Sequence, residues 1–124
     1  MAKIYTGKRT KDGVEVRIIH PQEDIEGFVS GSLPHIPFHS PTGFEWGYGG
    51  SGPADLALAI LVDFLDEHLP SESWEDPTFS QRIGKSKAWR YHQPFKWAFV
   101  AGFADKWELY DTQIEQWLKE QEAK

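Results

Sequence analysis

The segment from Pro53 to about Leu69 constrains the fold more than any other part of the chain. Every residue in the range 56–62 is apolar, and Pro70 ends the run. In a helical arrangement the polar residues share one narrow strip with Ala59, and they are Asp55, Asp63, Asp66 and Glu67. A helix that is apolar on nearly all sides is buried among other elements. We therefore predict a central helix over this segment.

A glycine-rich loop from Gly47 to Pro53 precedes this helix, with four glycines in six residues. Gly52 or Ser51 suits the N-cap, Pro53 suits the first helical position, and Asp55 in the first turn opposes the helix dipole. Small residues let backbone N–H groups approach a phosphate or carboxylate, which a helix N-terminus also favours. The candidate ligand-binding residues here are Tyr48, Gly49, Gly50, Ser51 and Gly52. The alternative is a tight turn whose glycines pack against neighbouring aromatic side chains.

The remaining pattern predicts one α+β domain over residues 1–124, with a small antiparallel sheet packed on about three helices. Residues 3–10 and 14–20 alternate as strands do, and residues 11–13 join them into a hairpin. The hairpin is extended by one or two short strands, for which residues 28–29, 44–48 and 106–110 are the candidates. Two further helices are expected, over about 94–103 and after a capping box at residues 112–115.

Composition excludes several classes of protein. The chain has no cysteine, so disulfides, thiolate metal sites and cysteine nucleophiles are absent. It shows neither the apolar stretch of a signal peptide nor an 18-residue uncharged run, so we expect a cytoplasmic protein with no membrane partner. A net charge of −6 discourages unspecific attraction to nucleic acid. Six Trp, eight Phe and four Tyr must either be buried or face a partner.

Basic residues are unevenly distributed. Ten of the thirteen fall within residues 3–17 and 82–96. If these segments are neighbours in space, they form a basic face on which aromatic rings can stack bases. The candidate ligand-binding residues of this face are Arg9, Lys87, Trp89 and Arg90, and the partner would be a protein or the phosphate of a nucleotide or nucleic acid. The alternative is that long charged side chains solvate two exposed segments.

An acid-only run follows the predicted central helix. It comprises Asp63, Asp66, Glu67, Glu72, Glu75 and Asp76. Such a run is usual for a solvated helix end, and it also suits contact with a basic partner. A protein that competes for a basic protein surface is therefore one alternative function.

A small hydrolase or transferase is a second alternative, with Glu45, His39 and Ser51 as the candidate catalytic residues. Glu45 stands beside the glycine-rich loop and would act as a general base if it were buried among the neighbouring aromatics. Ser51 does not form a G-x-S-x-G motif, because Pro53 stands where the final glycine belongs. The pattern for acyl transfer is therefore incomplete.

The five histidines show no spacing typical of a zinc site. His35 and His39 stand four residues apart, but Pro37 between them forbids a regular helix. We expect no metal and no cofactor. Lys96 lies in an otherwise apolar segment, and we expect it to pair with a buried acid such as Glu45 or Asp55.

The stretch from His39 to Ala59, H-S-P-T-G-F-E-W-G-Y-G-G-S-G-P-A-D-L-A-L-A, resembles the signature of a family of small uncharacterised proteins, a domain of unknown function. Residues 3–7 and 95–102 resemble the same family, so the likeness spans most of the chain apart from residues 70–90. The resemblance implies one small domain in a bacterial, plasmid or phage setting, and it carries no reaction or cofactor. The leading expectation is therefore a non-enzymatic binding module that engages a macromolecular partner or a phosphate-bearing ligand.

Overall fold

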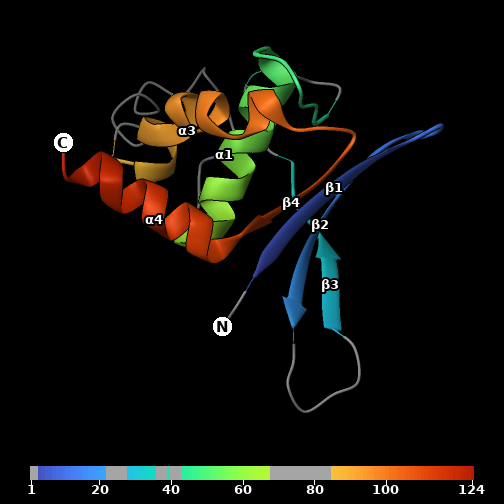
Figure 1. Cartoon of the computed structure of the whole chain (residues 1–124), viewed down its shortest axis with the longest axis horizontal. Helices are drawn as coiled ribbons and strands as arrows, with labels where there is room; N and C mark the ends of the chain where they lie inside the picture. Colours follow the sequence, from blue (N-terminus) through green and yellow to red (C-terminus); the bar gives the residue numbers. More distant parts are fainter. Residues whose placement is uncertain (1–2, 22–27, 36–38, 40–42, 68–84) are drawn as a thin grey trace. The chain divides into compact units, whose positions relative to one another are not determined.

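The computed structural model describes residues 3–21, 28–35, 39, 43–67 and 85–124. They fall into two compact units, Met1–Leu33 with Asp105–Lys124, and Pro34–Ala104. The first unit contains the sheet and the C-terminal helix, and the second contains two packed helices and a 3₁₀ turn (Figure 1). None of the helices in these described ranges is long and apolar enough to cross a membrane.

The first unit is built on a four-stranded antiparallel sheet. Its strands are β1 (Ile4–Thr10), β2 (Gly13–Pro21), β3 (Phe28–Ser32) and β4 (Lys106–Tyr110). They lie in the order β3-β2-β1-β4, so that β4, from the far end of the chain, pairs with β1 (Figure 1). The α+β class and the N-terminal hairpin are confirmed, and two short strands lie at the predicted residues 28–29 and 106–110.

One face of the sheet is apolar and the other is polar. The alternation in β1, β2 and β4 places their buried side chains on one face, and these include Tyr5, Val16, Ile18, Trp107 and Leu109. Gly7 pairs with Trp107 across β1 and β4, and a Cβ atom at Gly7 would overlap the indole ring. A glycine in mid-strand is required here because the Trp107 ring lies against the backbone of β1.

Helix α4 (Asp111–Glu122) begins earlier than the predicted capping box. The N–H of Tyr110 donates to Gln113 Oε1 at 2.9 Å, so Gln113 caps this end and Glu115 does not. Asp111 also ties the helix to the start of the sheet, because the N–H of Lys3 donates to Oδ2 of Asp111 at 3.1 Å and the carbonyl of Lys3 accepts the backbone N–H of Asp111 at 3.0 Å. The helix begins at Asp111, earlier than predicted, and the contacts of Asp111 with Lys3 hold this first residue in place.

The second unit is centred on α1 (Ser51–Leu65), which is buried from Gly52 through Leu61. This burial confirms the predicted central helix, but both predicted ends were wrong. Gly50 is the N-cap, so Asp55 is the fifth helical residue and the first turn has no acid. The helix ends at Leu65, and its C-cap is Asp66, whose φ of 53° lies in the left-handed region, so Pro70 does not terminate the helix.

Helix α3 (Lys87–Ala98) begins earlier than the helix predicted over about residues 94–103, and Pro94 lies inside the helix rather than at its start. Its N-cap is Ser86, whose Oγ accepts the N–H of Trp89 at 3.0 Å. Glu67, just after α1, completes the cap by accepting from Ser86 Oγ at 3.1 Å and from the N–H of Ala88 at 3.0 Å. Because Glu67 is about twenty residues away from the start of α3, its part in this cap leaves no local pattern in the sequence that would predict where the helix begins.

Residues 44–48 form no strand, contrary to the prediction. The N–H of Gly47 donates to the carbonyl of Val100 at 3.0 Å, in the 3₁₀ helix η1 (Val100–Gly102), instead of to a neighbouring strand. Trp46 is fully buried, and its indole N–H donates to the carbonyl of Ala104 at 2.8 Å. Trp46 therefore anchors this loop in the core of the second unit.

Candidate functional site

Two exposed aromatic rings lie against the glycine-rich loop. Tyr48 is 52% exposed and Trp97, in the last turn of α3, is 65% exposed. A Cβ atom at Gly49 would overlap the Trp97 ring, and one at Gly50 would overlap the Tyr48 ring. The two consecutive glycines therefore let both rings lie flush with the loop, which is the packing that the tight-turn alternative requires. The same packing leaves an exposed aromatic pair beside the start of α1.

The start of α1 has no acidic side chain in its first turn and no side-chain hydrogen bond at its N-cap. Ser51 is exposed and Gly52 is buried. Glu45 packs closely against Gly52, so that a Cβ atom added to this glycine would lie 2.7 Å from Cβ of Glu45. The first backbone N–H groups of a helix have no partner within the helix and favour a negative charge. The prediction that Asp55 lies in the first turn is wrong, because Asp55 is the fifth residue of the helix.

Asp55 instead organises the segment before the loop. It is fully buried, and its Oδ2 accepts a hydrogen bond from Nε2 of His35 at 2.9 Å. Its Oδ1 accepts the backbone N–H of His39 at 2.8 Å. The His35 ring also meets Phe44 edge-on, with 4.8 Å between centroids. The carboxylate thus fixes two histidines that the spacing in the sequence did not connect.

His39 continues this cluster to α3. Its Nε2 lies 3.0 Å from Nε2 of His92, and Nδ1 of His92 lies 2.5 Å from the carbonyl of Trp89. Because a carbonyl only accepts, Nδ1 of His92 carries the hydrogen, and its Nε2 accepts from His39. The rings of His39 and Trp89 are stacked at 5.7 Å. Five residues from three separate parts of the second unit therefore form one hydrogen-bonded chain, and Asp55 is one of them.

The neutral form of His92 is favoured in this cluster. Burial lowers the pKa of His92 from 6.5, and the neighbouring His39 and Lys96 lower it further. The hydrogen bond to Trp89 and the charge of Asp55 act in the opposite direction.

Lys96 is buried, and its ammonium group lies 4.6 Å from the ring centroid of Trp97. The structure gives it no ion pair with an acid in the described part of the second unit, contrary to the prediction. The cation lies on an aromatic ring instead, which is a favourable contact. It also brings a positive charge to the aromatic pair beside the loop.

The three catalytic candidates have different surroundings. Oε1 of Glu45 accepts the N–H of Trp46 at 3.2 Å, and Nε2 of His39 is already bonded to His92. Ser51 is exposed at the start of α1. A serine nucleophile needs a base with a free nitrogen, and Nε2 of His39 is engaged elsewhere. Among the described residues no group of histidines and acids could hold a metal ion.

The basic candidates lie in different units. Arg9, on β1, donates from Nε to Oδ1 of Asp105 at 3.1 Å. Lys87 and Arg90 are exposed in the first turns of α3, whereas Trp89 is half-buried in its stack with His39. A basic face that joins the two segments therefore stays a prediction. Arg82 and the acids Glu72, Glu75 and Asp76 lie outside the described residues.

The fold and the site together define a class of small α+β protein with an antiparallel sheet and a glycine-rich loop flanked by exposed aromatics. The chain belongs to a family of unknown function (DUF6166), whose model matches residues 5–83. That range includes β1 from its second residue onward, β2, β3, the glycine-rich loop and α1. No curated protein and no solved structure matches the chain.

Proposed function

We propose that this protein is a non-enzymatic binding module that holds a nucleotide, free or within a nucleic acid, at its glycine-rich loop. The ligand would stack a base on the exposed aromatic pair, Tyr48 and Trp97, and direct a phosphate to the start of α1. The absence of cysteine and the family resemblance support a cytoplasmic, phage or mobile-element setting for this role.

The observation that carries the proposal is the position of Tyr48 and Trp97. The described residues include only three large, exposed hydrophobic side chains, and two of them lie against adjacent glycines of the same loop. Exposed apolar side chains that gather in one place mark interaction sites, and bases stack on aromatic rings without regard to sequence. The loop is therefore the surface of the second unit that is best suited to an aromatic ligand.

The size of the ligand is limited by the geometry of α3. Lys87 and Trp97 are ten residues apart on this helix, which corresponds to ~15 Å along its axis. A mononucleotide at Trp97 does not reach the cations at the start of α3. A single strand of several nucleotides does, and Lys87 and Arg90 would then contact its further phosphates.

The histidine and aspartate cluster supports binding rather than catalysis. Asp55 and His92 are buried, and the hydrogen bonds described above account for both carboxylate oxygens of Asp55 and both ring nitrogens of His92. These groups hold the segment before the loop against α1 and α3. We therefore assign the cluster a structural role, in which it positions the glycine-rich loop.

The proposal is tested by calorimetric titration of the whole protein with inorganic phosphate, AMP and a single-stranded oligonucleotide. We expect Trp97→Ala and Tyr48→Ala each to weaken AMP binding by about five- to a hundredfold, because a stacked base contributes ~1–3 kcal/mol. The matched control is Tyr110→Ala, which removes the third exposed aromatic, in the other unit, and should leave binding unchanged.

Tighter binding of the oligonucleotide than of AMP, with the difference removed by Arg90→Gln, assigns the ligand to nucleic acid. Equal binding of both assigns it to a free nucleotide. No saturable binding of any probe, or binding that ignores Trp97→Ala, contradicts the proposal. Conversion of AMP that Glu45→Gln slows by about two to four orders of magnitude would make the protein an enzyme instead.

A further inference from the structure

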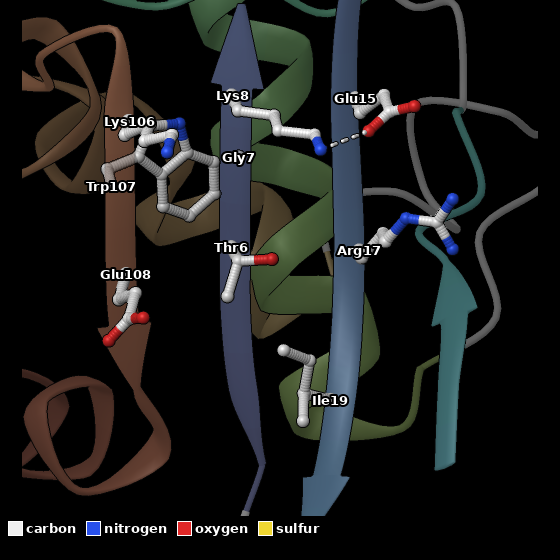
Figure 2. A pocket seen from close by; sticks show the side chains of 9 residues that line it. All are labelled: Thr6, Gly7, Lys8, Glu15, Arg17, Ile19, Lys106, Trp107 and Glu108. Atoms are coloured by element: carbon white, nitrogen blue, oxygen red, sulfur yellow. Dashed lines mark ion pairs between the residues drawn. The ribbon is translucent and has the colours of Figure 1, made fainter. Parts of the chain in front are cut away.

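The polar face of the sheet in the first unit is hollowed into a pocket of about 610 Å³ (Figure 2). That volume lies in the range of small-molecule sites. The pocket is lined by parts of β1, β2 and β4, and its charged side chains are Lys8, Arg17, Lys106, Glu15 and Glu108. Thr6 adds a hydroxyl group and Ile19 an apolar patch. Three cations and two acids give the lining a local charge of +1, on a chain whose net charge is −6.

Two lysines stand directly opposite each other in this pocket. Lys8 on β1 is the cross-strand partner of Lys106 on β4. Like charges that face each other across two strands destabilise a sheet. The ion pair of Lys8 with Glu15, at 3.3 Å, relieves only one of the two lysines, and both of its partners are about half exposed (Figure 2). An anion held between the lysines would compensate for this repulsion.

Two cations of the pocket are available to a ligand. The structure shows no ion pair for Lys106 or Arg17 with any residue in the described ranges. Both side chains are exposed. The exposed pair of Lys8 with Glu15 contributes little energy, so an anion can compete for Lys8 as well.

The acids in the lining limit what kind of anion fits. Glu108 lies next to Thr6 on the cross-strand row that also contains Arg17. The charge of Glu108, and the hydrogen bond that Glu108 accepts from the Tyr110 hydroxyl at 3.2 Å, raise the pKa of Tyr110. The Glu108 carboxylate therefore accepts a hydrogen bond from a hydroxyl group in this structure. Two carboxylates among three cations repel a polyanion such as nucleic acid, whereas they accept hydrogen bonds from the hydroxyl groups of a sugar.

We propose that this pocket binds a sugar phosphate, with the phosphate at Lys106 and Lys8 and the sugar hydroxyls at Glu108 and Thr6. Arg17 flanks the site from β2 and adds to its positive charge (Figure 2). This site lies in the first unit and uses neither Tyr48 nor Trp97, so it is independent of the nucleotide site proposed at the glycine-rich loop.

The experiment is a titration of the whole protein with ribose 5-phosphate, ribose and inorganic phosphate, followed by calorimetry and by amide chemical shifts. Ribose 5-phosphate should bind tightest, and Lys106→Gln and Arg17→Gln should each weaken it by about tenfold or more. The matched control is Lys11→Gln, which removes the same charge from the exposed hairpin turn outside the pocket. Circular dichroism confirms that each variant is folded.

Glu108→Gln tests the sugar contact separately from the charge. We expect it to reduce the preference for ribose 5-phosphate over inorganic phosphate, whereas a purely electrostatic site would bind both more tightly. Four results would overturn the proposal: no saturable binding, equal weakening by Lys11→Gln, shifts confined to the second unit, or an oligonucleotide that displaces the sugar phosphate. Trp97→Ala should not affect this titration, which separates it from the test of the loop.

Discussion

Nε2 of His35 donates a hydrogen bond at 2.9 Å to Oδ2 of Asp55, which is fully buried in α1 twenty residues later in the chain. The other oxygen of this carboxylate holds the backbone of His39. One acid therefore fixes the segment before the glycine-rich loop at two points. A buried charge is tolerated here because both of its oxygens have donors.

Replacing Asp55 with Asn should reduce the free energy of unfolding by ~1–3 kcal/mol. Asn keeps one acceptor and turns an N–H₂ group toward one of the two donors, which loses a hydrogen bond to a charged group. Urea unfolding measures the loss. The control is Asp12→Asn in the exposed hairpin turn, where we expect a change within ~0.5 kcal/mol. Equal effects of the two changes would contradict a structural role for Asp55.

Replacing Gly7 with Ala should destabilise the first unit by ~1–3 kcal/mol, because the new methyl group overlaps the Trp107 ring and forces a shift in a packed core. Gly31→Ala in β3 is the matched control, since nothing lies within 4 Å of a Cβ atom there. That change should be neutral within ~0.5 kcal/mol. Thermal unfolding of both variants decides the matter, and a neutral Gly7→Ala would show that the ring does not lie where the structure places it.

Stability should fall as the pH drops below about 6.5. The pKa of His92 is lowered in the folded protein, mainly by burial, so below its ordinary value of 6.5 the unfolded chain binds more protons than the folded one. The loss begins near pH 6.5, levels off below the folded pKa, and cannot exceed ~1.4 kcal/mol per pH unit for one group.

The comparison with His92→Gln isolates the contribution of His92 to this pH dependence. A glutamine oxygen can accept from His39 and its amide can donate to the carbonyl of Trp89, so the cluster keeps its hydrogen bonds without the titration. Unfolding of both proteins in urea from pH 5 to pH 8 should give a flatter profile for the variant. Identical profiles would refute the role given to His92.

Replacing Glu67 with Ala should destabilise the second unit by ~1–2 kcal/mol, because it removes the cap at the start of α3. Glu115→Ala is the control, since it breaks an exposed pair with Lys119 that contributes only ~0.3–0.5 kcal/mol. Hydrogen exchange of the amides of α3 reports the local effect. If exchange near Ala88 does not change, Glu67 does not act as the cap.

Local patterns predicted the elements whose partners are close in the sequence or repeat regularly. The alternation around Val16 predicted the hairpin, and the apolar run through Ile60 predicted the buried helix. The ends of α1 and α3 were missed because they depend on Asp66 in the left-handed region and on Glu67 as a distant cap. The histidine cluster was missed because His39 and His92 are 53 residues apart.

The sequence by itself therefore determined the class of fold, the β1–β2 hairpin and the burial of the central helix, since periodic burial leaves a periodic pattern. Only the tertiary structure decided which aromatic ring lies against each glycine of the loop and which histidines Asp55 holds. It also brought Lys8 opposite Lys106 by pairing the first strand with the last. Contacts between distant segments depend on chain topology, and no local propensity records them.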